Sequence, residues 1–184
     1  MKTVLIVEDE KMIRQGIKTM IMRSGVPIEV IMECNNGETA LEILKEQEID
    51  VMFTDIRMPK MDGIELVQKM QSLEHIPLTV AISGYDDFSY AVEMLRNGVR
   101  EYILKPIERE KITEILKKLN AEIESRKEKE ENNQKIGYQQ MRHLMLSDEI
   151  SGEEQRTIES QYADHFYTGN YYVCCQNQVK RGEL

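Results

Sequence analysis

Between Lys2 and Asn120 the chain alternates short apolar runs with longer amphipathic segments. Five of the runs are too short for helices and rich in Val and Ile, which predicts strands at 3–7, 28–33, 51–54, 79–82 and 101–104. In the segments between them apolar residues recur every three or four positions, which predicts helices. An alternation of strands and helices is typical of a parallel α/β sheet. Because the strand runs are almost continuously apolar, we expect them to be buried on both faces.

Turn-forming pairs separate the predicted elements and agree with this periodicity. They are Asn36-Gly37, Asp62-Gly63, Ser83-Gly84 and Asn97-Gly98. The pattern predicts a doubly wound, five-stranded parallel sheet, for which we assume the strand order 2-1-3-4-5.

The composition changes after Asn120. The segment 122–134 is dense in Glu, Lys, Arg and Asn and holds few large apolar residues, so it is expected to be an exposed helix or a linker. A possible strand at 171–175 lacks partners with which to form a core. We therefore expect residues 1–120 to be one domain and residues 121–184 to be a charged helical linker followed by a partial or truncated C-terminal segment.

Charge and cysteine content narrow the class of protein. The 184 residues carry 24 Lys and Arg against 33 Asp and Glu, a formal charge of -9, which disfavours non-specific attraction to nucleic acid or to anionic membranes. No window approaches the roughly 18 apolar residues of a membrane span. Of the three cysteines, Cys174 and Cys175 are adjacent, unlike the spaced pairs that hold zinc. These features favour a cytoplasmic protein that is not attached to a membrane.

Polar side chains follow four of the five predicted strands. In an open parallel sheet the ligand crevice lies beyond the carboxyl ends of the strands, where the strand order reverses. With the assumed order, a carboxylate cluster with a hydroxyl and an ammonium group beside it should form there, from Glu8, Asp9, Asp55, Ser83 and Lys105.

Such a cluster suits magnesium and phosphoryl chemistry. Neighbouring carboxylates repel one another unless a cation neutralises them. Magnesium takes oxygen ligands and is typically held by one or two carboxylates with phosphate oxygens, a role that suits Asp9 and Asp55. Lys105 and Ser83 can bind the oxygens of a phosphoryl group. Asp55 is then the candidate nucleophile, because a carboxylate can attack phosphorus to give an acyl phosphate.

Four segments, in this order and spacing, resemble the receiver domain of two-component response regulators. They read Val7-Glu8-Asp9-Glu10, Asp55-Ile56-Arg57-Met58-Pro59-Lys60-Met61-Asp62-Gly63, Ser83-Gly84-Tyr85-Asp86-Asp87-Phe88 and Lys105-Pro106. The resemblance covers about residues 1–120 and implies a flavodoxin-like sheet. The third segment is also similar to the YesN-like subgroup, whose members usually carry an AraC-type helix-turn-helix. None is visible here, so DNA is expected to be contacted only through a domain not present in this chain.

The resemblance also implies roles for single residues. Asp55 would accept a phosphoryl group from the histidine of a sensor kinase. Glu8, Asp9 and Asp55 would hold Mg2+ with the backbone carbonyl of Arg57. No turnover of a separate substrate is implied, only phosphoryl transfer to the domain itself and slow dephosphorylation.

Further implied roles concern the change of conformation. Lys105 and Ser83 would bind the phosphoryl oxygens, and the Lys105-Pro106 peptide bond would be cis. Ser83 and Tyr102 would act as the switch and repack the surface of the fourth helix, fifth strand and fifth helix. That surface is a possible homodimer contact. The expected output is control of transcription.

Three other functions remain open from the residues. A phosphohydrolase with Asp55 as nucleophile would need a second acid two residues further on, where Arg57 stands. A flavin-binding protein shares the predicted sheet, but the acidic residues 8–10 would repel the flavin phosphate. The third is a receiver-like protein-interaction module that works without phosphorylation.

Overall fold

A computed structural model describes residues 1–84 and 88–146, with side chains described within 1–84, 90–129, 131–133 and 135. Strands and helices alternate along the chain, as predicted. Their bounds are β1 (Thr3–Val7), α1 (Lys11–Met22), β2 (Val30–Cys34), α2 (Gly37–Glu46), β3 (Val51–Asp55), α3 (Gly63–Met70), β4 (Leu78–Ser83), α4 (Phe88–Arg96), β5 (Glu101–Leu104) and α5 (Arg109–Leu146).

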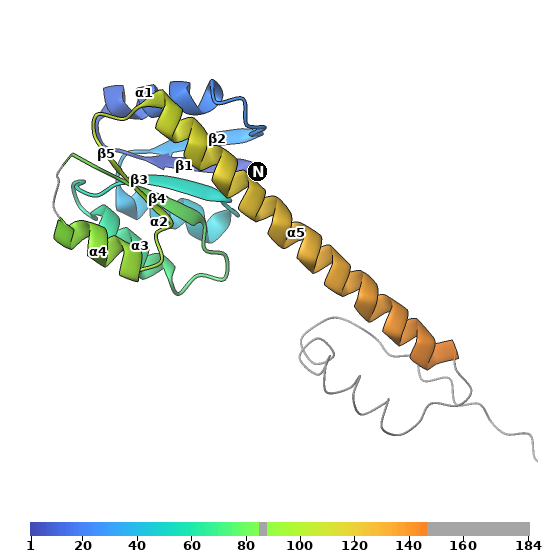
Figure 1. Ribbon diagram of the computed structural model, residues 1–184. Coiled ribbons are helices and arrows are strands. Elements are labelled where there is room, and N and C mark those ends of the chain that lie inside the picture. Colours follow the sequence, from blue (N-terminus) through green and yellow to red (C-terminus); the bar gives the residue numbers. More distant parts are fainter. Residues whose placement is uncertain (85–87, 147–184) are drawn as a thin grey trace, which may run out of the picture. The chain divides into compact units, whose positions relative to one another are not determined.

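The strands form one parallel sheet in the order β2-β1-β3-β4-β5, which confirms the predicted order. Helices α1 and α5 cover one face of the sheet, and α2, α3 and α4 cover the other (Figure 1). All strands run the same way, so their last residues lie at one edge of the sheet, which we call the carboxyl edge. The opposite edge, where the strands begin, is the amino edge.

The predicted strand bounds differ most for β2. It begins two residues later than predicted, at Val30, and ends at Cys34. The expectation that every strand is buried on both faces is wrong for this strand, whose first residue is 48% exposed and whose next three are partly buried. It is also wrong for β5 at the other border, where Leu104 is 43% exposed. The reason is the place of β2 and β5 at the borders of the sheet, where each pairs with one strand alone. The central strand β3 is buried throughout.

Side-chain caps begin two of the helices at the predicted turns. The Asn36 side chain accepts a hydrogen bond from the backbone of Thr39 at the start of α2, and the Asp62 side chain accepts one from Glu65 at the start of α3. Such caps satisfy backbone N–H groups that have no partner within the helix. Gly63 follows the second cap, and a Cβ there would lie 2.2 Å from the backbone oxygen of Asp55. Only glycine therefore lets α3 begin so close to the end of β3.

The two faces of the sheet are packed with different side chains. The face under α1 and α5 is filled almost entirely by Ile, Val and Leu, with Phe53 at its centre. The face under α2, α3 and α4 also holds smaller residues and several buried methionines, which are Met52, Met58, Met61, Met70 and Met94. Methionine is unbranched and adapts its shape easily, so this second face is the one better able to repack.

Two compact units can be distinguished, Met1–Lys127 and Glu128–Leu184. Helix α5 begins in the first and continues into the second, so the charged segment 122–134 is helical. The apolar seam at the start of α5 is buried against the sheet, through Ile112, Leu116, Leu119 and Ile123. The possible strand at 171–175 lies outside the described residues, and the domain boundary at 120 stays a prediction.

Among the helices that the structure describes, none combines the length and the apolar composition needed to cross a lipid bilayer.

Candidate functional site

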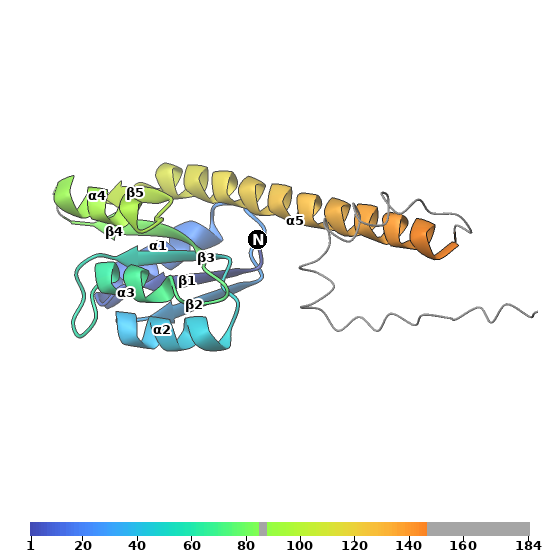
Figure 2. The same ribbon diagram turned by 90° about the horizontal axis from the view of Figure 1, so that it is seen from below.

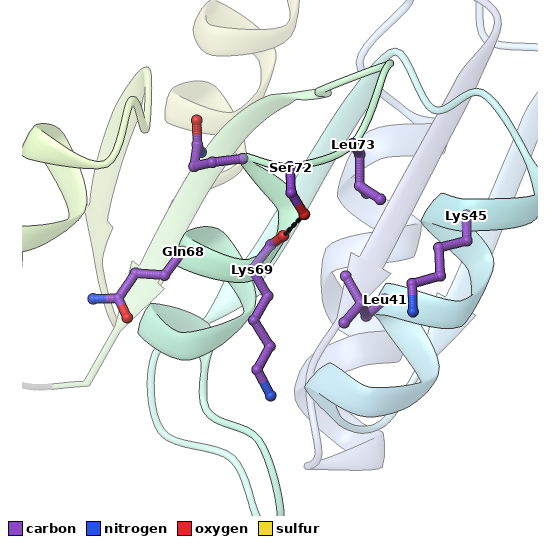
Figure 3. A pocket seen from close by; sticks show the side chains of 7 residues that line it. Leu41, Lys45, Gln68, Lys69, Ser72 and Leu73 are labelled. Atoms are coloured by element: carbon purple, nitrogen blue, oxygen red, sulfur yellow. Dashed lines mark hydrogen bonds between the residues drawn. The ribbon is translucent and has the colours of Figure 1, made fainter.

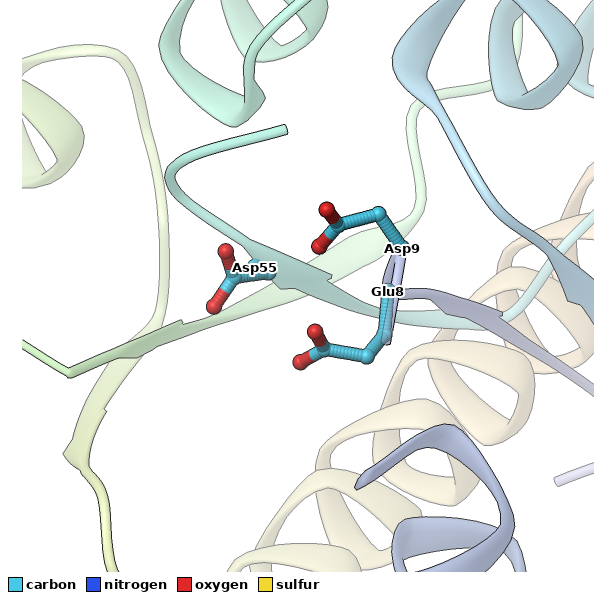
Figure 4. A group of neighbouring side chains, drawn as sticks. All are labelled: Glu8, Asp9 and Asp55. Atoms are coloured by element: carbon cyan, nitrogen blue, oxygen red, sulfur yellow. The ribbon is translucent and has the colours of Figure 1, made fainter. Parts of the chain in front are cut away.

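Three carboxylates meet at the carboxyl edge of the sheet. Glu8 and Asp9 directly follow β1, and Asp55 is the last residue of the neighbouring strand β3. One oxygen of each side chain lies within 4.8 Å of the others (Figure 4). Glu8 is fully buried and Asp55 nearly so, whereas Asp9 is exposed. The structure thus brings together the acidic cluster expected from the strand ends.

Lys105 joins two of these carboxylates. Its Nζ lies 2.7 Å from Asp55 Oδ1 and 2.9 Å from Glu8 Oε2. The residue follows β5 directly, and its backbone N–H donates to the Ser83 carbonyl oxygen at 2.7 Å, which fixes it against the end of β4. The Lys105-Pro106 peptide bond is cis, as the resemblance implied. The ammonium group is placed where it can also neutralise a group bound to Asp55.

Burial sets the acidity of these side chains. It raises the pKa of Asp55, and the hydrogen bond from Lys105 offsets only part of that effect. Burial also raises the pKa of Glu8, with the Lys105 contact opposing it and the Asp55 charge adding to it. For Lys105, burial acts to lower the pKa, but the contacts with both carboxylates outweigh it and raise the pKa above its usual value. Three carboxylates thus share one lysine, and the charged forms of the two buried ones are disfavoured unless a further cation binds.

The residues of the cluster fit a hard divalent cation. All three donors are carboxylate oxygens, which Mg2+ prefers. Although Glu8 Oε2 is ion-paired with Lys105, it is the buried side-chain oxygen of the described residues that accepts no well-aligned hydrogen bond. Lys105 is shared between this oxygen and Asp55, so a second cation would offset the remaining cost of burying the carboxylates. Glu8, Asp9 and Asp55 could together hold a metal ion.

Arg57 contacts the cluster through its backbone and α4 through its side chain. Its N–H donates to Asp55 Oδ2 at 3.0 Å. Its guanidinium donates to the Tyr90 hydroxyl and lies 5.2 Å from the centre of that ring. Sequence analysis missed this contact, because Arg57 lies in the loop after β3 and Tyr90 lies on α4, 33 residues away. The role of the Arg57 carbonyl as a metal ligand stays a prediction.

Ser83 and Tyr102 lie on neighbouring strands. Ser83 ends β4 and is buried. Tyr102 on β5 is partly buried, packs on the face under α2, α3 and α4, and stands opposite Ala81 in the sheet register. Residues paired in register point to the same face, and so does Ser83, two positions after Ala81. The predicted switch pair therefore shares one face of the sheet, beside a side chain as small as alanine.

Two cavities among the described residues lie at opposite edges of the sheet. One, of about 500 Å3, adjoins the cluster, and its lining includes Asp9, Arg57, Met58 and Tyr90. The other, of about 520 Å3, lies between the last turns of α2 and α3 at the amino edge (Figure 3). Its lining contains two lysines but no carboxylate. The cavity beside Asp9 is therefore the one that gives access to the acidic cluster.

Comparison with known proteins agrees with this geometry. The model of the response regulator receiver domain family matches residues 4–117. The transcriptional regulatory protein YesN of Bacillus subtilis is 31% identical over 123 residues, 67% of this chain and 33% of that protein. The transcriptional regulatory protein HptR of Staphylococcus aureus is 32% identical over 117 residues, 63% of this chain and 45% of that protein. The chain thus matches less than half the length of these curated relatives.

Solved structures with the same fold include two receiver domains. The response regulatory domain of mrkE from Klebsiella pneumoniae is 31% identical, with a TM-score of 0.62, and the match covers 67% of this chain and 98% of that one. The receiver domain of AraT, a response regulator from Geobacillus stearothermophilus, is 35% identical, with a TM-score of 0.59, over 68% of this chain and 97% of that one. Both matches cover nearly the whole solved chain, so the similarity extends over a complete domain.

Proposed function

The chain belongs to the response regulator receiver domain family, and from that premise we propose that Asp55 accepts a phosphoryl group from a phosphohistidine of a sensor kinase. The observation that carries the proposal is the contact of Lys105 with both Asp55 and Glu8 at 2.7 and 2.9 Å, beside a third carboxylate. Receiver domains are signalling domains rather than enzymes with a separate substrate. The kinase is accordingly the proposed partner, and the cytoplasm the proposed location.

The transfer requires one bond to form and one to break. A carboxylate oxygen of Asp55 attacks phosphorus, the P–N bond to the kinase imidazole breaks, and the electron pair stays on the imidazole nitrogen. Lys105 and Ser83 then bind the phosphoryl oxygens and orient the group in line for attack. Mg2+ held by Glu8, Asp9 and Asp55, with the Arg57 carbonyl, would offset the negative charge on those oxygens. Slow attack of water on the phosphorus of the acyl phosphate breaks its bond to the carboxylate oxygen, releases inorganic phosphate and returns Asp55 to its starting form.

The response to phosphorylation is proposed to pass through Ser83 and Tyr102. A phosphoryl group on Asp55 would draw the Ser83 hydroxyl toward it. This movement of Ser83 would leave space on the face of the sheet on which Tyr102 also lies. Rotation of the Tyr102 ring into that space would repack the α4, β5 and α5 surface. We propose this surface as the contact of a homodimer and as the link to transcription. Contact with DNA would be made by a separate DNA-binding domain.

The test is the intact mass of the protein after incubation with acetyl phosphate and MgCl2. Wild-type protein should gain one phosphoryl group, and Asp55→Asn should gain none. Asp62→Asn is the matched control, because Asp62 lies in the same loop but caps α3, and asparagine caps a helix as well as aspartate does. It should be phosphorylated like the wild type.

Two results would contradict the proposal. A phosphoryl gain in Asp55→Asn would mean that another residue is the acceptor. No gain with acetyl phosphate or with a phosphorylated kinase would leave the fold intact and favour a receiver-like interaction module that works without phosphorylation.

A further inference from the structure

Arg14 reaches from α1 back to the backbone of the acidic loop. It lies in the first turn of the helix, and its side chain is only 15% exposed. Its Nη1 donates to the Glu8 carbonyl oxygen at 2.5 Å and lies 3.4 Å from the Asp9 carbonyl oxygen. Long side chains on a helix point toward its N-terminus, which explains how Arg14 meets a loop that precedes it. The Arg14 guanidinium thus contacts the backbone carbonyls of Glu8 and Asp9 and leaves their side-chain carboxylates to the cluster.

Glu33 on β2 holds Arg14 in this position. Glu33 Oε2 lies 3.7 Å from Arg14 Nε, and the same carboxylate accepts hydrogen bonds from Gln15 and Lys18. The Glu8 N–H, for its part, donates to the Cys34 carbonyl oxygen at 3.2 Å. Both backbone groups of Glu8 are therefore tied to the end of β2, one directly and the other through Arg14.

The position of Arg14 is unfavourable for the helix itself. The N-terminus of a helix carries partial positive charge, so a cation in the first turn is repelled there. Helix α1 has no acidic residue in its first turn, and Glu10, which precedes it, makes no side-chain cap. A local rule broken in this way is expected where a residue serves a site instead of its own helix.

We propose that Arg14 is a positioning residue of the metal site. It fixes the backbone of Glu8 and Asp9 so that their side chains converge with Asp55, and Glu33 orients it. The inference rests on the proposed function, because it concerns the Mg2+ held by that cluster. Removal of a residue that orients metal ligands without binding the metal itself commonly weakens metal affinity by a factor of ten or more.

Charge alone predicts the opposite sign, which makes the proposal testable. Arg14→Met removes a positive charge near a cation site, so the loss of electrostatic repulsion by itself would strengthen metal binding. Loss of positioning weakens it. Lys18→Met is the matched control, since Lys18 lies on the same helix and binds the same Glu33 but contacts neither loop carbonyl.

The measurement is Mn2+ binding, followed by electron paramagnetic resonance of free and bound ion and by competition with Mg2+. We expect Arg14→Met to raise the Kd about tenfold, and Lys18→Met to leave it within about twofold. Arg14→Lys, which keeps one donor group, should recover part of the affinity. Glu33→Gln should weaken binding in the same direction by a smaller factor, and its milder change provides a readout if Arg14→Met is poorly folded. Urea unfolding in EDTA checks that each variant is folded.

Several outcomes would overturn the inference. They are an unchanged or tighter Kd in Arg14→Met, an equal weakening in Lys18→Met, and the absence of metal binding by the wild type. Phosphorylation by acetyl phosphate at saturating Mg2+ is measured separately. If the Kd values change as expected and no phosphoryl group is gained, the phosphoacceptor function fails and the positioning role stands.

Discussion

The two edges of the sheet handle charge in opposite ways. At the carboxyl edge Glu8 and Asp55 are buried and share a single lysine. Away from the cluster many ion pairs are exposed, as in the pair of Lys69 with Glu65 along α3 and, at the amino edge, the pair that a protonated His75 forms with Glu48. Exposed pairs of this kind add little to stability, whereas buried charges cost free energy unless they are well paired. The buried cluster at the carboxyl edge is therefore the part of the molecule that gives up stability for the sake of its chemistry.

The largest effect expected from this comparison is on two lysines. Lys105→Met leaves two buried carboxylates without their cation and should lower the free energy of unfolding by about 3 kcal/mol in EDTA at neutral pH. Lys69→Met removes an exposed pair along α3, away from the cluster, and should cost at most about 0.5 kcal/mol. Urea unfolding measures both. Equal effects in the two variants would show that the edges do not differ as described.

Two glycines allow the same test to be made on the backbone. A Cβ at Gly63 would meet the Asp55 carbonyl oxygen at 2.2 Å, and the other atoms nearest to it are also backbone atoms of Asp55 and Ile56, which cannot turn aside as a side chain could. Gly63→Ala should therefore cost about 2–3 kcal/mol and lower the rate of Asp55 phosphorylation. Gly98, at the amino edge, has a φ of 84° and open space around it, so Gly98→Ala should cost about 1 kcal/mol. Thermal or urea unfolding checks the order, and a smaller loss for Gly63→Ala would refute it.

Neutralising a carboxylate should raise the free energy of unfolding at the carboxyl edge but not at the amino edge. Asp55→Asn removes one of two buried, mutually repelling carboxylates and should raise the free energy of unfolding by about 1 kcal/mol in EDTA at neutral pH. Glu48→Gln at the amino edge affects an exposed pair and should change it by less than about 0.5 kcal/mol. The measurement is again urea unfolding, and destabilisation by Asp55→Asn would contradict the expectation.

The smallest expected effect is a dependence of the free energy of unfolding on pH. The pKa values of Asp55 and Glu8 are raised above their usual 3.8 and 4.5, so above those values the folded state binds more protons than the unfolded state. The free energy of unfolding should then fall as pH rises from about 4 toward neutrality. The raised pKa of Lys105 acts above 10.5 and lies outside this window. Asp55→Asn and Glu8→Gln should each flatten the curve measured in EDTA, and a wild-type curve that rises over this range would show that the sign is wrong.

Much of the fold followed from periodicity alone. The bounds predicted for β1 and β5 are those of the structure, because each is a short apolar run between polar residues. For β2 the apolar run was mistaken for full burial, since its composition does not reveal that the strand lies at the border of the sheet. The caps at Asn36 and Asp62 were foreseeable, because their bonds are made within four residues.

The candidate site was foreseeable to a similar degree. Polar residues at strand ends must meet at one edge of a parallel sheet, so the grouping of Asp9, Asp55 and Lys105 needed only the strand order. Arg14 and Tyr90 were missed, since an arginine and a tyrosine on amphipathic helices look like ordinary surface residues. Their roles depend on contacts between a helix and a loop that belongs to another part of the chain.

Most strands and helices, and the polar groups at the strand ends, could be predicted from the amino-acid sequence, because those features depend on side chains that are near neighbours in the chain. The three-dimensional fold was needed to show that Glu8 is buried beside Lys105, that Asp9 is exposed, and that Arg14 donates hydrogen bonds to the acidic loop. Burial and pairing depend on segments dozens of residues apart coming together, and burial is what raises the pKa of Asp55 and makes the cluster receptive to a cation.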